Sequence, residues 1–133
     1  GLKCSEELTR ARPRYYIIEP DLSIVVDKLK IMGLEIDTLN FDELLQVESY
    51  EIVSQEKSPQ VFQGFRENIV TTNLVNEEKV FKKGTYVVPM NQRKSNIAVE
   101  TLEPEMRSGF LRFNVIQPSE INKIHRYVQN KEL

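Results

Sequence analysis

The chain has 133 residues, of which 40% are hydrophobic and 29% are charged, so it fits one globular domain and not a disordered chain. Its 18 basic and 20 acidic residues give a net charge of −2, which excludes the basic surface expected of a general nucleic-acid-binding protein. No apolar run approaches the roughly 20 residues that a membrane-spanning helix needs, so the sequence predicts no membrane span.

The chain divides into a short N-terminal stretch and one domain. Residues 1–13 are mostly polar and end in proline, so we interpret them as a lead-in or linker, and residues 14–133 as a single α+β domain. From Arg14 to Glu19 the apolar residues form a continuous run, which is typical of a strand covered on both faces. This strand is expected to lie inside the sheet.

A helix and a second strand are predicted next. Asp21 is expected to cap the helix, whose apolar residues recur at helical spacing as far as Gly33, a residue suited to the position after a helix. Leu34 to Asp37 then alternates apolar and acidic residues, as a strand with one covered face does. The order predicts an N-terminal βαβ unit in a mixed sheet. The junction at Pro20 lacks the glycine-rich loop of a nucleotide site, which favours a structural role.

The middle of the chain predicts further strands joined by turns. Gln46 to Val53 can form a strand, and Ser58-Pro59 marks a turn. Asn68 to Val75 is β-branched and alternating, and residues 76–78 can turn the chain back into Lys79 to Phe81. These patterns predict an antiparallel hairpin near Asn76.

The strongest local signals lie between residues 81 and 105. Gly84 suits a turn, because a residue without Cβ enters positive φ at no steric cost, and Thr85 to Val88 then predicts a strand. A second short helix is expected within 92–103, with Asn91 or Ser95 as its cap. For residues 118–133, helical spacing and an extended strand both remain open.

Several short blocks carry a resemblance to a known family. In chain order they are Tyr16 to Pro20, Leu29 to Ile36, Phe62-Gln63-Gly64, Tyr86 to Pro89 with Gln92, Leu102 to Glu105, Gly109 to Asn114 and Ile124 to Tyr127. Together they resemble the region C-terminal to the catalytic domain in large bacterial zinc carboxypeptidases, in the metallocarboxypeptidase family that includes carboxypeptidase A. The resemblance implies an aromatic strand at Gly109 to Asn114 and an extended Ile124 to Val128. Met32 and Phe65 stand where the family often has histidine, so roles tied to those histidines are not carried over.

The chain lacks the residues for the family's chemistry. Such a zinc site needs a His-x-x-Glu pair and a second, distant histidine. The sequence holds one histidine, His125, and the residue three places on is Val128. We therefore expect no catalytic and no metal-binding residue in this chain, and zinc only in the absent catalytic domain. A Ser-His-Asp triad has no specific signal either.

The resemblance implies two alternative functions. One is a non-catalytic C-terminal accessory domain that docks on, or positions substrate for, an upstream peptidase domain of the same polypeptide. The other is an independent peptide- or glycan-binding module of the same fold. The resemblance also implies secretion or a periplasmic location.

Two sets of site residues follow. Phe62, Gln63, Gly64, Glu103 and Glu105 are predicted interdomain contacts, because they place an aromatic ring, a flexible backbone and two carboxylates outside the regular elements. In the alternative, Phe62 is ordinary core, and the glutamates cap a helix or bond to arginines such as Arg107 and Arg112. The second predicted set is a buried polar network of Tyr86, Gln92 and Glu103.

Overall fold

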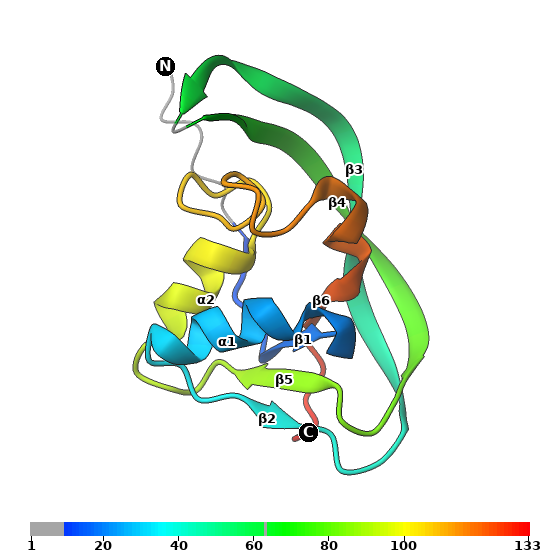
Figure 1. The fold of residues 1–133 in the computed structure, drawn as a ribbon. Helices are drawn as coiled ribbons and strands as arrows, with labels where there is room; N and C mark the ends of the chain where they lie inside the picture. Colours follow the sequence, from blue (N-terminus) through cyan, green and yellow to red (C-terminus); the bar gives the residue numbers. More distant parts are fainter. Residues whose placement is uncertain (1–9, 63) are drawn as a thin grey trace.

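The computed structural model describes residues 10–62 and 64–133 and confirms the α+β class (Figure 1). Its elements are β1 (Tyr15–Ile18), η2 (Pro20–Leu22), α1 (Ser23–Ile31), β2 (Asp37–Thr38), β3 (Glu43–Phe62), β4 (Phe65–Phe81), β5 (Tyr86–Pro89), α2 (Ser95–Leu102), η3 (Pro118–Lys123) and β6 (Ile124–Tyr127). The strands form one sheet in the order β2-β5-β1-β6-β3-β4. Each pairing among these strands is antiparallel.

The expected βαβ unit is present in a split form. Strand β5 pairs antiparallel with β1 through Ile17 and Val87, and antiparallel with β2 through Val87 and Asp37. Strands β1 and β2 therefore run in the same direction, but β5 lies between them. Among the described strands no two neighbours are parallel, so the sheet is antiparallel where a mixed sheet was expected. The reason is burial: β1 is buried at each of its positions and needs two neighbours, whereas β2 is short and exposed and suits an edge.

Helix α1 confirms the helix expected after the first strand, but its start differs. Asp21 does not cap it; Asp21 lies in the 3₁₀ turn η2, where it forms an ion pair with Lys123. Pro20 opens that turn with a φ angle already suited to a helix, so the chain enters α1 without a side-chain cap. Gly33 follows the helix at a φ of 105°, as predicted.

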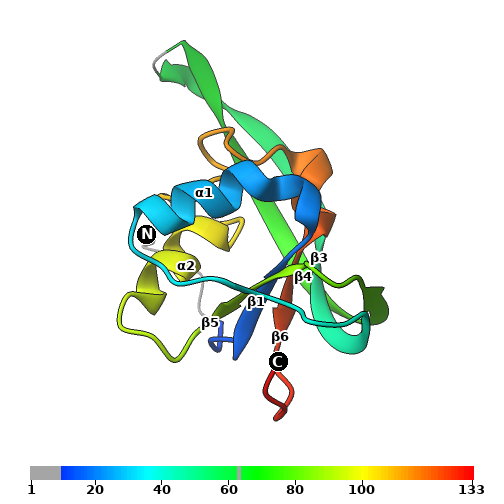
Figure 2. The same cartoon turned by 60° about the horizontal axis from the view of Figure 1, so that its bottom comes forward.

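Strands β3 and β4, of 20 and 17 residues, form one long hairpin. The hairpin turn predicted at residues 76–78 is wrong, because β4 runs straight through them and Asn76 pairs with Glu48. The chain reverses beside Gly64, whose φ of 88° suits a tight turn that residues 76–78 would enter only with strain. Ser58-Pro59 is likewise part of β3, at a shift of register. Figure 2 shows the tip of this hairpin projecting away from the helices.

The second half of the chain follows the local signals except in one stretch. Gly84 turns the chain at a φ of 91°, and α2 lies within the expected range, although neither Asn91 nor Ser95 caps it; the residue before α2 is Lys94. The aromatic strand expected at residues 109–114 is wrong. That stretch is a series of turns, in which Asn114 has a φ of 65° that a strand does not allow. Strand β6 is extended, as the resemblance implied.

Two apolar clusters cover the two faces of the sheet. On one face, Tyr16 and Ile18 of β1 pack in the cluster that holds the buried residues of α1 and α2. On the other face, Tyr15 and Ile17 pack with residues of the curled hairpin, among them Phe81. Strand β1 is therefore covered on both sides, as its continuous apolar run predicted.

Candidate functional site

A cluster of buried charges lies where α2 meets the sheet. We call Arg10, Tyr16, Glu103 and Arg126 the buried charge cluster. Glu103 directly follows α2, and its side chain is 3% exposed. Its Oε2 atom accepts hydrogen bonds from the Tyr16 hydroxyl at 2.7 Å and from Arg126 Nη1 at 2.5 Å, and its Oε1 atom accepts one from Arg10 Nη1 at 3.1 Å. One carboxylate thus joins the N-terminal segment, β1 and β6.

The register of the sheet places these side chains. Tyr16 in β1 lies opposite Arg126 in β6, and Arg126 lies opposite Glu48 in β3. The three residues therefore form a row across neighbouring strands. Arg126 Nε donates to Glu48 Oε1 at 2.9 Å, and its Nη2 atom donates to the carbonyl oxygen of Ala11. Such a set of bonds is what a buried guanidinium needs in place of water.

The ionisation of the cluster follows from its surroundings. Burial and the neighbouring Glu103 carboxylate raise the pKa of the Tyr16 hydroxyl, so it remains a proton donor. Burial alone would lower the pKa of Arg126, but Glu103 and Glu48 outweigh that effect and raise it. The Tyr50 hydroxyl is buried without a hydrogen-bond partner among the described residues, and burial with the nearby Glu103 charge raises its pKa. The cluster is therefore a network of paired hydrogen-bonding groups that joins separate parts of the chain.

Arg10 extends this network to the hairpin. Its Nη2 atom donates to the Thr72 carbonyl oxygen at 3.1 Å and to the Thr72 hydroxyl at 2.9 Å, and its Nη1 atom also bonds to Glu105 Oε1 at 3.1 Å. Glu105 accepts the backbone N–H of Thr72 at 2.8 Å, so it covers a backbone donor at the outer edge of β4. The guanidinium lies 5.7 Å from the centre of the Tyr50 ring. The last residues of the predicted lead-in are therefore held against the domain.

A second buried network contains the histidine. His125 Nε2 lies 2.7 Å from Glu19 Oε2, and Nδ1 lies 2.8 Å from Ser49 Oγ, an order of groups that resembles a catalytic triad. The Ser49 hydroxyl, however, donates its one hydrogen to Glu77, and Ser49 is buried in the middle of β3. Burial lowers the pKa of His125 although Glu19 opposes this effect. The arrangement links β1, β3, β4 and β6 and does not present a free nucleophile.

The predicted site residues do not all come together. Glu103 lies in the buried charge cluster, whereas Gln92 bonds to the backbone of Glu35 and to the Pro89 carbonyl oxygen. Tyr86 lies in β5 and pairs with Ile18 and Thr38. Tyr16 and Arg126 are therefore partners of Glu103. Tyr86 and Gln92 lie elsewhere in the fold.

The predicted interdomain residues fall into two places. Glu103 and Glu105 both form ion pairs with Arg10 within the chain. Their interdomain role stays a prediction. Phe62 and Gly64 lie at the end of the hairpin, where Gly64 is exposed, and Gln63 lies outside the described residues. Arg112, one of the arginines that the alternative interpretation gave as partners of the glutamates, pairs with Glu67.

Sequence reasoning missed Arg10, Tyr16 and Arg126. Their contacts join segments that are 23 to 93 positions apart, which periodicity cannot predict. One signal was available: Arg126 lies in Ile124–Tyr127, a short strand buried at each position, and a charge there needs a buried partner.

The residues present do not fit the zinc site of a carboxypeptidase. Both ring nitrogens of His125 are engaged by Glu19 and Ser49. Among residues 10–62 and 64–133, no group of three histidine, cysteine or carboxylate side chains lies in a geometry that could hold a metal ion. No helix in these ranges is long and apolar enough to cross a membrane.

Comparison with known proteins relates the chain to carboxypeptidases. It is 33% identical over 112 residues to carboxypeptidase 2 of Trichophyton equinum, which is 84% of this chain and 21% of that protein. It is 32% identical over 109 residues to carboxypeptidase 2 of Trichophyton rubrum, which is 82% of this chain and 20% of that protein. No family model and no solved structure matches.

The chain is thus a carboxypeptidase-related region, and it spans about a fifth of the length of the curated relatives it matches. Those relatives come from fungi, so the bacterial origin expected from the resemblance has no support.

Proposed function

We propose that this chain is a non-catalytic accessory region of a carboxypeptidase-like protein and docks against the peptidase portion of the same polypeptide. The observation that carries the proposal is the one-sided match: more than four fifths of this chain aligns with only a fifth of carboxypeptidase 2. The catalytic machinery of such a protein would then lie in the part outside the match. Zinc and a secreted location belong to the whole protein in this proposal.

The anchored N-terminal segment supports docking over loose tethering. Arg10 is bonded to Glu103, Glu105 and Thr72, and Arg126 bonds to the Ala11 carbonyl oxygen. A preceding domain would therefore reach this one at Arg10, a point held against the domain, through residues 1–9. A short connection to a held point favours a defined interface between the two parts, whose area in one chain is commonly on the order of 600–1,500 Å².

The hairpin arm supplies a candidate interface. We use this name for residues 53–62 and 64–68, the end of the β3–β4 hairpin beyond the residues of β3 that pair with β6. Val53 and Val61 on the arm are 57% and 62% exposed. A projecting two-stranded ribbon is only marginally stable by itself, and exposed valines on it gain by being covered. Two of the predicted contacts, Phe62 and Gly64, lie at its end.

The proposal is tested by the encoded sequence before Gly1 and by two assays. We expect that sequence to contain a His-x-x-Glu pair and a second histidine. The separately expressed upstream portion should release carboxyl-terminal residues from peptides and bind zinc. The 133-residue chain should do neither. Turnover by the chain alone, with stoichiometric zinc held by His125, would contradict the proposal.

A further inference from the structure

The outer edge of β4 is covered along the half that is nearer the hairpin arm. Strand β4 is the last strand of the sheet, so one of its sides has no neighbouring strand. On that side the Asn68 N–H donates to the Arg112 carbonyl oxygen at 3.1 Å, and the Thr72 N–H donates to Glu105 Oε2 at 2.8 Å. Arg10 donates to the Thr72 carbonyl oxygen at 3.1 Å. These contacts take the place of a neighbouring strand.

The other half of the same edge has no such cover. In an antiparallel pair, successive residues point their N–H and C=O groups alternately toward the partner strand and away from it. Thr72 points its groups away from β3, and the register stays unbroken from Thr72 to Phe81, so every second residue after Thr72 does the same. These residues are Leu74, Asn76, Glu78 and Val80. Among the residues that the structure describes, none bonds to their outward backbone groups. We call residues 74–80 the open edge.

The open edge can be reached by another strand. Asn76 and Glu78 are exposed, and Val75 and Val80 are 42% and 54% exposed. Figure 1 shows this half of β4 at the right of the molecule, away from α1 and α2. The stretch contains no proline and no shift of register, the devices that commonly prevent an edge from pairing. An extended segment can therefore bind here through backbone hydrogen bonds.

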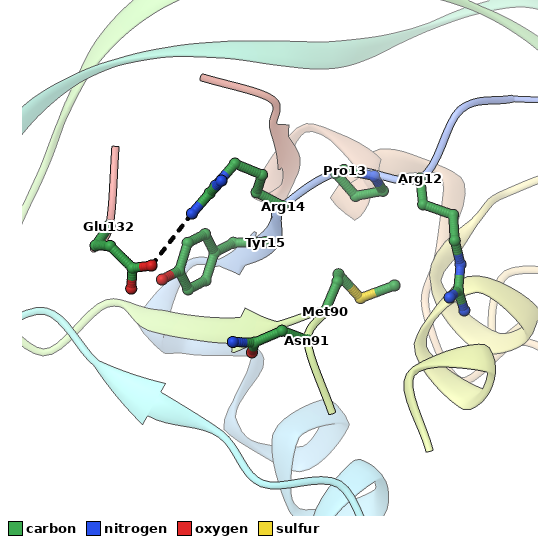
Figure 3. Close-up of a pocket in the computed structure, with 7 residues that line it drawn as sticks. All are labelled: Arg12, Pro13, Arg14, Tyr15, Met90, Asn91 and Glu132. Carbon is green, nitrogen blue, oxygen red and sulfur yellow. Dashed lines mark hydrogen bonds and ion pairs between the residues drawn. The ribbon is translucent and has the colours of Figure 1, made fainter. Parts of the chain in front are cut away.

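The N-terminal segment comes to the sheet beside the open edge. Arg10 donates to the Thr72 hydroxyl at 2.9 Å, just before the open edge begins. Figure 3 shows Arg12 and Arg14 on the stretch that leads from there into β1, and Arg12 is held by the side-chain oxygen of Asn96 at 2.7 Å. A peptidase portion joined through residues 1–9 would thus be tethered near this edge, which raises its local concentration there.

We propose that the open edge binds an extended strand of the peptidase portion, which pairs beside β4 and lengthens the sheet. This inference rests on the proposed docking and names the backbone groups that carry it. The side chains indicate what the added strand contains. Val80 lies opposite Leu44, which is 61% exposed, so an apolar residue that covers both is favoured. Glu78 has no ion pair among the described residues, which favours a basic residue near it.

The test compares hydrogen exchange in the full-length polypeptide and in the 133-residue chain. In the full-length polypeptide the outward amides at positions 74, 76, 78 and 80 should exchange about tenfold more slowly or less, whereas those at 75, 77 and 79, which face β3, should be unchanged. This alternation distinguishes an added strand from mere covering. Equal exchange at the outward amides in both proteins would overturn the proposal. So would slowing in the 133-residue chain that grows with its concentration, because a second copy would then occupy the edge.

A matched pair of variants tests the same backbone group. Glu78→Pro removes an N–H that does not bond to β3, a change that an edge strand tolerates, and Glu78→Ala removes the same side chain but keeps the N–H. Association of the separately expressed parts should be about tenfold weaker for Glu78→Pro than for Glu78→Ala, as expected for a lost hydrogen bond. Equal association of the two variants would overturn this inference and leave docking in place. No association of the unchanged parts would overturn both.

Discussion

The guanidinium of Arg10 lies 3.1 Å from the carboxylate of Glu103, although 93 positions separate them in the sequence. The pair closes the N-terminal segment against the end of α2, and both partners are almost fully buried. A buried ion pair adds little stability compared with apolar residues of similar volume in its place. Breaking the pair, however, leaves a buried charge without a partner.

Glu103→Ala should therefore destabilise the fold severely. It would leave the Arg126 and Arg10 guanidiniums buried beside a missing carboxylate, and removing one partner of a buried pair costs about 3–5 kcal/mol. Urea unfolding measures the loss. Glu132→Ala, which removes a carboxylate from an exposed pair, should change stability by less than about 1 kcal/mol. Equal effects of the two substitutions would show that the cluster is not a structural centre.

Arg10→Met should release the N-terminal segment without unfolding the domain. The variant loses the bonds to Glu103, Glu105 and Thr72, but Glu103 keeps its bond from Arg126 and Glu105 keeps the Thr72 N–H. Hydrogen exchange at Ala11 and Arg12 should then become faster, while exchange in β1 should remain slow. Unchanged exchange at residues 11 and 12 would mean that the bonds of Arg10 do not hold the segment.

Stability should fall with mild acid because of His125. Burial holds the pKa of the folded-state imidazole below its ordinary value of 6.5, so the contribution is present above pH 6.5 and is lost as the pH falls below it. The pKa of Glu19 is also lowered, because hydrogen bonds from Lys79 and His125 outweigh its burial; its contribution is lost only below about pH 4.5.

The readout for His125 is the slope of unfolding free energy against pH between 7.5 and 5.5. His125→Gln should flatten that slope, whatever it does to stability itself, because glutamine does not titrate. A chain that gains stability on acidification in this range, or a variant with an unchanged slope, would contradict the assignment.

Gly33→Ala should be destabilising because of its backbone conformation. The position has a φ of 105°, which should cost an alanine roughly 1–2 kcal/mol. An added Cβ would also lie 2.7 Å from Lys94 Nζ, but this atom is the end of a flexible side chain that can move aside. Thermal unfolding should therefore give nearly the same cost for Gly33→Ala in the original chain and in a Lys94→Ala background; a clearly smaller cost without the lysine side chain would contradict this expectation.

Neighbouring residues were enough to predict a strand that is buried throughout and a turn that needs a glycine with positive φ. The continuous apolar run of β1, the turn at Gly84 and the helix α2 could all be predicted from neighbouring residues. The hairpin was misplaced because residues 76–78 are polar and turn-like, and their pairing with residues 46–48 depends on a partner strand that begins more than 25 positions earlier. Gly64 carried the true signal, but its block was interpreted as a docking site.

The candidate site could be predicted only in part. Glu103 was singled out because it lies outside a helix, but its partners Tyr16 and Arg126 are brought to it by the register of β1 and β6. Register depends on which faces of distant strands are buried, and a single sequence does not specify this.

Docking of this chain on the peptidase portion of its own polypeptide is tested most directly by the association of the two as separately expressed parts. We expect binding that Phe62→Ala, at the end of the hairpin arm, weakens by about 2 kcal/mol, or roughly 30-fold. Arg10→Met should also weaken it, because this variant releases the N-terminal segment while the domain stays folded. Ile24→Ala, at a side chain of α1 that is 68% exposed and outside the arm, should have no effect. No association at high concentration, or association indifferent to Phe62→Ala and Arg10→Met, would show that the two parts do not dock in this way.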